Sequence, residues 1–233
     1  MALVIENLTV AKNGRELVRD VSMSVERGQV TAVLGANGAG KSELVLAVAG
    51  MLPIARGRIS VDGRAIQGCS PDVVRLAGVA AVPEGHRVLS KLSVDDNLRA
   101  AGSMLAGDQV GPAVAHVYAL FPELAERKRQ LAGTMSGGQQ QMLSIGHALM
   151  AHPKYLLIDE MSLGLAPLIV KRLVKTIESL VANGVGVVLV EQFTEVALSV
   201  ATSVVVMRGG GLRYAGPVSD VKAKPEILAS AYF

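Results

Sequence analysis

The first 30 residues alternate apolar and polar positions, with residues 3–10 and 21–25 following a period of two. This period is typical of β-strands that bury one face. Between the two segments, Asn13 and Gly14 form a dipeptide that favours a tight hairpin, because both residue types tolerate positive φ. The sequence therefore predicts a small antiparallel sheet at the N-terminus.

Further along, short runs are almost entirely apolar, which is typical of parallel strands covered on both faces. Such strands are predicted at residues 30–34, 79–82, 155–158, 185–190 and 203–207, and another strand at 57–61. Helical patterns are predicted after the first run, at residues 72–76 and 168–181, and from residue 194. Alternation of strands and helices favours an α/β fold with a mostly parallel sheet. The glycines at 209–211 predict a flexible turn.

Between residues 84 and 151 the pattern becomes helical. Helices are predicted at residues 94–101 and 113–121, with breaks at Gly102, Gly107 and Pro122, and a further helix is predicted to begin after Ser136 and to run through Gln141 to Leu149. This stretch interrupts the alternation of strands and helices. We therefore expect a single domain, 1–233, whose α/β core (1–83 and 152–233) carries an inserted helical subdomain (84–151).

Composition narrows the class of protein. Half of the 233 residues are hydrophobic and 18% are charged, yet no apolar stretch approaches the roughly 18 residues of a membrane span. The N-terminus lacks the basic and apolar regions of a signal peptide. The single cysteine, Cys69, excludes an intrachain disulfide framework. A net charge of +3 is too small to indicate a nucleic-acid partner.

Candidate chemistry begins with Gly-Ala-Asn-Gly-Ala-Gly-Lys-Ser at residues 35–42, between a predicted strand and a predicted helix. This is the G-x-x-x-x-G-K-[ST] phosphate loop in its expected setting. Its glycines let backbone N–H groups converge on phosphate oxygens, and the helix adds its positive end. Lys41 would reach the β- and γ-phosphates, and the Ser42 hydroxyl would ligate Mg²⁺. The predicted nucleotide-binding residues here are Gly35, Asn37, Gly38, Ala39, Gly40, Lys41, Ser42 and Glu43.

Two further motifs follow in a fixed order. Residues 135–139 read Met-Ser-Gly-Gly-Gln, and residues 155–160 read Tyr-Leu-Leu-Ile-Asp-Glu, followed by Ser-Leu-Gly-Leu at 162–165. With the phosphate loop, this order resembles the ATP-binding cassette (ABC) ATPases over essentially the whole chain. The resemblance implies a P-loop NTPase (RecA-like) core with an N-terminal antiparallel β subdomain and an inserted α-helical subdomain. It also implies ATP and Mg²⁺ as cofactors.

Asp159 and Glu160 end an apolar run, so they should lie at the carboxyl edge of a buried strand, where open α/β sheets bind ligands. An acidic pair that caps a helix is the alternative explanation. The resemblance implies that Asp159 holds Mg²⁺ through water and that Glu160 polarises the water attacking the γ-phosphate.

Ser136 is a good N-cap for the helix that follows it. The resemblance implies a second role, in which this helix start is presented to the γ-phosphate held by another subunit. The residues expected to bind nucleotide in this way are Ser136, Gly137, Gly138 and Gln139.

Two positions depart from the usual ABC pattern in an informative way. Glu84 stands where glutamine is usual, and its carboxylate can still ligate Mg²⁺. Gln192 stands where the switch histidine is usual; it can hydrogen-bond the γ-phosphate but cannot titrate. The segments Val-Pro-Glu-Gly and Val-Glu-Gln around these residues resemble an ATPase subunit of the branched-chain amino acid importers.

Two other departures concern the nucleotide itself. Lys12 and Asn13 stand where an aromatic residue commonly stacks on adenine. Glu43 follows Ser42, and its carboxylate would repel the α-phosphate if it faced inward. An impaired ATPase subunit is therefore one alternative function.

The resemblance implies a transport ATPase, peripheral on the cytoplasmic face of the membrane, that dimerises with itself or with a paralogous subunit. It would power a separate permease docked near residues 84–100, including Val88, Leu89 and Leu92. Branched-chain or related amino acids would be supplied by a periplasmic or extracellular solute-binding protein. A soluble ABC-type ATPase acting on ribosomes or DNA is the alternative from another class.

Overall fold

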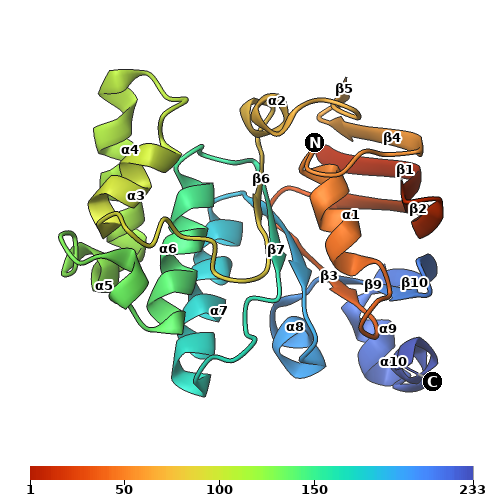
Figure 1. Ribbon diagram of the computed structural model, residues 1–233. Helices are drawn as coiled ribbons and strands as arrows, with labels where there is room; N and C mark the ends of the chain where they lie inside the picture. The colour runs from red at the N-terminus through yellow and green to blue at the C-terminus, as the bar shows by residue number, and fades with distance from the viewer. Residues whose placement is uncertain (233) are drawn as a thin grey trace.

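The computed structural model describes residues 1–232 and, within them, one ten-stranded mixed sheet of order β5-β4-β1-β2-β10-β9-β3-β8-β7-β6 (Figure 1). The strands are β1 (Ala2–Lys12), β2 (Arg15–Glu26), β3 (Val30–Leu34), β4 (Arg56–Val61), β5 (Arg64–Ala65), β6 (Val79–Val82), β7 (Tyr155–Asp159), β8 (Gly186–Val190), β9 (Ser203–Arg208) and β10 (Gly211–Pro217). Every strand predicted from the sequence is present, and the α/β fold class is confirmed.

Strands β3, β6, β7, β8 and β9 form the parallel part of the sheet. Their side chains alternate between two apolar clusters. In β7, Leu157 joins the cluster that contains helix α1 (Lys41–Val48), whereas Leu156 and Ile158 join the cluster that contains α6 (Gly137–Leu149) and α7 (Pro167–Ala182). Because both faces are covered, every residue of β7 and β8 is buried. Double coverage explains the apolar runs of the sequence.

The antiparallel part begins with the β1–β2 hairpin, whose turn places Asn13 at φ 52° and Gly14 at φ 75°. Strand β10 pairs antiparallel with β9 and meets β2 at Gly211 and Arg19, so the two parts form one sheet. The sequence analysis predicts neither β10 nor β5. The prediction of a turn over residues 209–211 is too long, because Gly211 already belongs to β10.

Ten α-helices and one short 3-10 helix (Ala132–Thr134) lie within the described residues. The α-helices are α1 (Lys41–Val48), α2 (Pro71–Leu76), α3 (Val94–Ala101), α4 (Gly107–Leu120), α5 (Pro122–Ala125), α6 (Gly137–Leu149), α7 (Pro167–Ala182), α8 (Thr194–Val200), α9 (Val218–Ala223) and α10 (Glu226–Tyr232). The predicted break at Gly107 is wrong: α4 begins there and includes Pro112. Burial of Ala113, Val114 and Val117 outweighs the weak helix propensity of these two residues.

Figure 1 shows α3, α4, α5 and α6 together beside the sheet, on the side away from β1, β2 and β4. Their buried side chains share one apolar cluster with strands β6, β7 and β8. The division into a core and an inserted subdomain stays a prediction. None of the helices in residues 1–232 has the length and apolar character needed to cross a membrane.

Candidate nucleotide site

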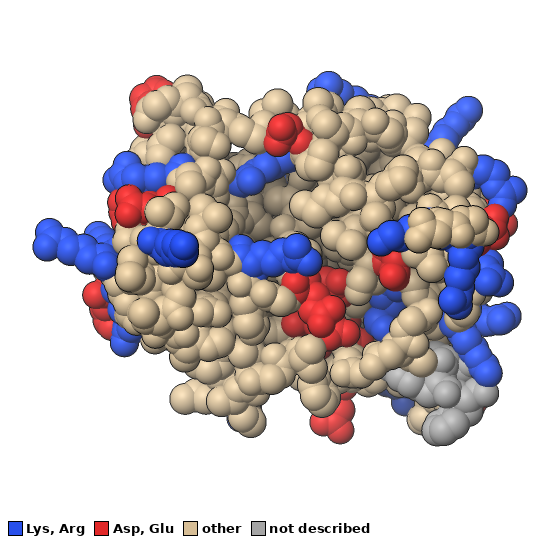
Figure 2. Space-filling model, in the orientation of Figure 1, with Lys and Arg blue, Asp and Glu red and all other residues tan. Residues whose placement is uncertain are grey.

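Strands β3, β8, β7 and β6 are neighbours in the sheet and run parallel, so their carboxyl ends share one edge. The loops leaving these ends bring together residues that are far apart in sequence, as expected for an open α/β sheet. They form a cavity of about 450 Å³ lined by Asn37, Gly38, Gly40, Lys41, Ser42, Glu43, Glu84, Glu160, Leu163 and Gln192. Figure 2 shows acidic side chains gathered in the middle of one face of the molecule, with basic side chains around them.

The phosphate loop owes its path to two close backbone approaches. A Cβ added to Gly35 would lie 2.2 Å from the Met207 carbonyl oxygen, and one added to Gly40 would lie 2.4 Å from that of Leu17. Gly40 also has φ 94° at the N-cap of α1, a conformation that side chains disfavour. Gly35 and Ala39 are buried and do not line the cavity.

Lys41 lies inside the loop with only 5% of its surface exposed. Its Nζ donates hydrogen bonds to the carbonyl oxygens of Gly35 (2.8 Å) and Ala36 (3.1 Å). Burial lowers the pKa of the ammonium, and the nearby carboxylates of Glu160 and Asp159 oppose this shift. The loop thus holds a cation where phosphate groups would bind.

Asp159 is a buried carboxylate, with only 2% of its surface exposed. Burial raises its pKa to about 6, Glu160 and Glu84 act in the same direction, and a hydrogen bond with Ser42 opposes them. Its Oδ1 atom is buried and has no hydrogen-bond partner. An unpartnered carboxylate oxygen beside a hydroxyl is a donor set that fits Mg²⁺.

Nowhere in the described residues, this site included, could a group of three or more histidine, cysteine or acidic side chains hold a metal ion. Mg²⁺ usually keeps several waters and contacts substrate phosphates, so it needs few protein ligands. Ser42 and Asp159 are the residues that would hold the ion, with Glu84, which also lines the cavity, as a candidate third. When bound, the ion would neutralise phosphate charge.

Glu160 lines the cavity in a left-handed backbone conformation, with φ 52°. Its N–H donates to the Val190 carbonyl oxygen (2.9 Å), which fixes the turn at the end of β7. Non-glycine residues adopt this conformation at a cost, and such residues are concentrated at functional sites. The turn directs the Glu160 carboxylate to the cavity while Asp159 stays buried behind it.

The end of β8 connects two loops of the site. Gln192 donates from Nε2 to Asn37 Oδ1 (3.0 Å) in the phosphate loop. Its neighbour Glu191 is 1% exposed and accepts hydrogen bonds from Ser162 N (3.0 Å) and Ser162 Oγ (2.6 Å). Burial raises the pKa of Glu191. The sequence analysis gave Glu191 no role; its position directly after five buried residues was the available signal.

The signature residues 136–139 lie at the start of α6 and do not line the cavity of their own chain. Ser136 Oγ accepts from Gln139 N, and Gln139 Oε1 accepts from Ser136 N (3.1 Å), which forms a capping box. The predicted N-cap role of Ser136 is confirmed. Ser136 and Gly137 are exposed, so this helix start is open to solvent.

Glu43 lines the nucleotide cavity and a neighbouring pocket of about 220 Å³ that includes Arg15 and Arg19. Its charge opposes the lowering of the Lys41 pKa that burial causes, although less than Glu160 and Asp159 do. Lys12 ends β1 beside the hairpin turn.

Comparison with known proteins agrees with this geometry. The family described as ABC transporter matches residues 18–162, a span that contains the phosphate loop, the signature and the acidic pair. The chain belongs to the ABC transporter ATP-binding family. As members of this family hydrolyse ATP, this ABC protein is an ATPase.

Several relatives of this ABC ATPase match it over most of their length. The high-affinity branched-chain amino acid transport ATP-binding protein BraG of Pseudomonas aeruginosa is 44% identical over 195 residues, or 84% of each chain. The probable branched-chain amino acid transport ATP-binding protein LivF of Archaeoglobus fulgidus is 29% identical and covers 87% of this chain and 86% of its own. The lipopolysaccharide export protein LptB of Escherichia coli K12 is 29% identical, with 94% of this chain and 92% of its own covered.

Solved structures show the same fold. A nucleotide-free ATP-binding cassette from an ABC transporter superposes with a TM-score of 0.88 at 24% identity, covering 98% of both chains. An ABC transporter cassette in its ADP conformation has a TM-score of 0.87 at 25% identity and the same coverage.

Proposed function

We propose that this ATPase powers the uptake of branched-chain or related amino acids through a separate permease, at the cytoplasmic face of the membrane. The observation that carries the proposal is the 44% identity to BraG over 84% of both chains. The positions of Glu84 and Gln192 support it, because both departures from the usual ABC pattern line the nucleotide cavity. Glu84 and Gln192 are also the residues whose surrounding segments resemble this class of importer.

The catalytic unit is a head-to-tail dimer. The cavity of one chain contains Lys41, Glu160 and Gln192 but not Ser136. The open start of α6 offers backbone N–H groups and a positive helix end, which suit the γ-phosphate of a nucleotide on another subunit. In this arrangement Lys41 binds the β- and γ-phosphates, Glu160 orients water, and Gln192 leaves Asn37 to bond the γ-phosphate.

The permease docks on the surface around residues 84–100. Leu89 is 49% exposed and Leu92 is 38% exposed, which supports a contact with an apolar partner. Val88, by contrast, packs partly against the core and offers less surface.

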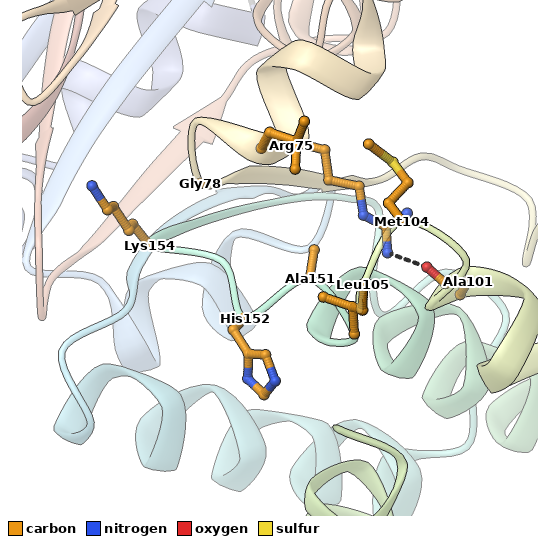
Figure 3. Close-up of a pocket in the computed structure, with 9 residues that line it drawn as sticks. Arg75, Gly78, Ala101, Met104, Leu105, Ala151, His152 and Lys154 are labelled. Atoms are coloured by element: carbon orange, nitrogen blue, oxygen red, sulfur yellow. Dashed lines mark hydrogen bonds between the residues drawn. The ribbon is translucent and has the colours of Figure 1, made fainter. Parts of the chain in front are cut away.

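A groove lies between α2 and the ends of α3 and α6. It has a volume of about 160 Å³ and is lined by Arg75, Leu76, Gly78, Ala101, Met104, Leu105, Ala151, His152 and Lys154. Figure 3 shows Arg75 reaching across it to the Ala101 carbonyl oxygen (3.0 Å). Arg75 also donates to the His147 carbonyl oxygen (2.7 Å), so one guanidinium joins three helices at the groove. A permease segment bound in this groove would be displaced when these three helices move.

Lipopolysaccharide export is the second candidate function. It is favoured by LptB, which matches a larger share of this chain than BraG does, although at only 29% identity.

Reconstitution tests the proposal directly. The chain, the permease encoded beside it and the neighbouring solute-binding protein are placed in vesicles with ATP on the ATPase side. Labelled leucine, isoleucine or valine should accumulate, and each should stimulate ATP hydrolysis. The same vesicles with Lys41→Ala serve as the control. Stimulation by lipopolysaccharide, with none by these amino acids, would replace the first candidate by the second.

A further inference from the structure

His86 lies two residues after Glu84 in the loop that leaves β6, and its backbone has φ 45°. This left-handed conformation is uncommon for a residue other than glycine. The side chain crosses to α6, where its Nδ1 lies 2.6 Å from Gln141 Oε1. Because an amide oxygen can only accept, Nδ1 carries the proton and donates it.

The contact on α6 is well defined. Gln141 is only 2% exposed, so its side chain has little freedom. One turn earlier, a Cβ added to Gly137 would lie 3.7 Å from His86 Nε2, which places the imidazole against the first turn of the helix. Residues four apart share one face of a helix, so His86 binds the face that carries Gly137 and Gln141.

The other hydrogen bonds of residues 84–88 are local: Arg87 Nε donates to the Glu84 carbonyl oxygen (3.3 Å), and Val88 N donates to the His86 carbonyl oxygen (2.7 Å). Further along the loop, the carbonyl oxygens of Ser90 and Leu92 accept from Gly133 N (3.0 Å) and Ala132 N (2.9 Å), but these are backbone bonds to the segment before α6. His86 is thus the residue whose side chain carries a hydrogen bond from the Glu84 loop to the signature helix.

We propose that His86 is a positioning residue that makes the Glu84 loop and the start of α6 move together. Glu84 lines the nucleotide cavity of its own chain, and Ser136 faces the nucleotide of the second subunit in the dimer of the proposed function. Through His86, nucleotide bound in the cavity of one chain determines the position of residues 136–139 of that chain, which complete the nucleotide site of the second subunit. The proposal therefore rests on that dimer.

Four variants test the link: His86→Ala, His86→Phe, His86→Asn and Gln141→Ala. Phenylalanine keeps a ring against Gly137 without a donor, and asparagine keeps an N–H donor near the position of Nδ1. His86→Ala and His86→Phe should lower kcat about tenfold while the affinity of the single subunit for ATP stays within about twofold. His86→Asn should restore most of kcat. His116→Ala, on the exposed face of α4, is the matched control and should behave as wild type.

A double-mutant cycle identifies the partner. If the two residues act through their hydrogen bond, the variant with both His86→Phe and Gln141→Ala should lose no more kcat than either alone. In a Glu160→Gln background, His86→Phe should also raise the ATP concentration needed for dimerisation.

The proposal would be overturned if the losses of kcat in the two single variants added up in the double variant, or if kcat did not change. It would also be overturned if the variants lost thermal stability and their ATP affinity and kcat fell by the same factor. Failure of Glu160→Gln to dimerise with His86 intact would instead refute the dimer itself. If His86→Ala does not fold, His86→Phe and His86→Asn give the same comparison.

Discussion

The ammonium group of Lys41 is held in place before phosphate binds, since it is buried and donates hydrogen bonds to carbonyl oxygens of the loop. Lys41→Ala removes the charge that the β- and γ-phosphates would meet. We expect ATP turnover to fall by on the order of 10² or more, because several kcal/mol of transition-state stabilisation are lost. Steady-state ATPase assays measure this, with the exposed Lys175→Ala as control. Turnover within about twofold of wild type would contradict the assignment.

His147 illustrates a residue whose charge state depends on burial. Burial is the main cause that lowers the pKa of His147 to about 4, and the positive charge of Arg75 is a smaller one. The Nε2 atom of His147 has no hydrogen-bond partner. Because the folded pKa is below the unfolded value of about 6.5, this stabilisation is present above pH 6.5 and is lost as the pH falls toward 4.

His147→Leu removes this dependence. Between pH 7 and pH 4 the wild-type protein should lose about 3 kcal/mol more free energy of unfolding than the variant. Denaturant titrations at the two pH values measure the difference. His116→Leu, at an exposed position, should keep the wild-type slope; an equal slope in His147→Leu would show that His147 is not the acid-sensitive group.

At the scale of elements, the family resemblance implies that the turn of the β1–β2 hairpin meets the base of the nucleotide. This turn carries Lys12 and Asn13, without an aromatic ring. Stacking on such a ring is worth roughly 1–3 kcal/mol per base. We therefore expect affinities for ATP and GTP within about tenfold of each other, measured by equilibrium binding to the purified subunit. Lys12→Tyr should strengthen the binding of both nucleotides. A strong preference for ATP in the wild type would show that another side chain supports adenine.

At the scale of the whole molecule, the proposed function makes the site complete only when two chains combine. Glu160→Gln keeps the shape of the side chain but removes the charge that we propose orients water, so hydrolysis should fall by about 10² or more. ATP would then persist between Lys41 of one chain and Ser136 of the other. Since nucleotide bound across the interface stabilises the dimer, the variant should elute from a sizing column as a dimer with ATP and as a monomer with ADP.

Ser136→Arg in the same background should abolish the dimer by steric and charge conflict, while ATP still binds the phosphate loop. The experiment is repeated with a paralogous subunit, because an obligate heterodimer would not self-associate. If neither pairing gives an ATP-dependent dimer, the signature does not act across an interface.

Much of the fold follows from local sequence. The apolar runs predicted strands β3, β6, β7, β8 and β9, because residues covered on both faces must be apolar at every position. The glycines of the phosphate loop predicted its conformation, since a Cβ at Gly35 or Gly40 would collide with a backbone oxygen of another strand. Ser136 predicted the start of α6, because capping depends on residues three apart in the chain.

Only the tertiary structure decided which distant residues meet. Strand β10 was missed because its residues are half exposed and its pairing with β9 and β2 depends on neighbours far along the chain. Likewise, Glu191 is held by Ser162, and His86 by Gln141 on another element. Local patterns record the spacing of residues along a chain, whereas these contacts depend on the order of strands in the sheet and on burial, which the folded chain alone sets.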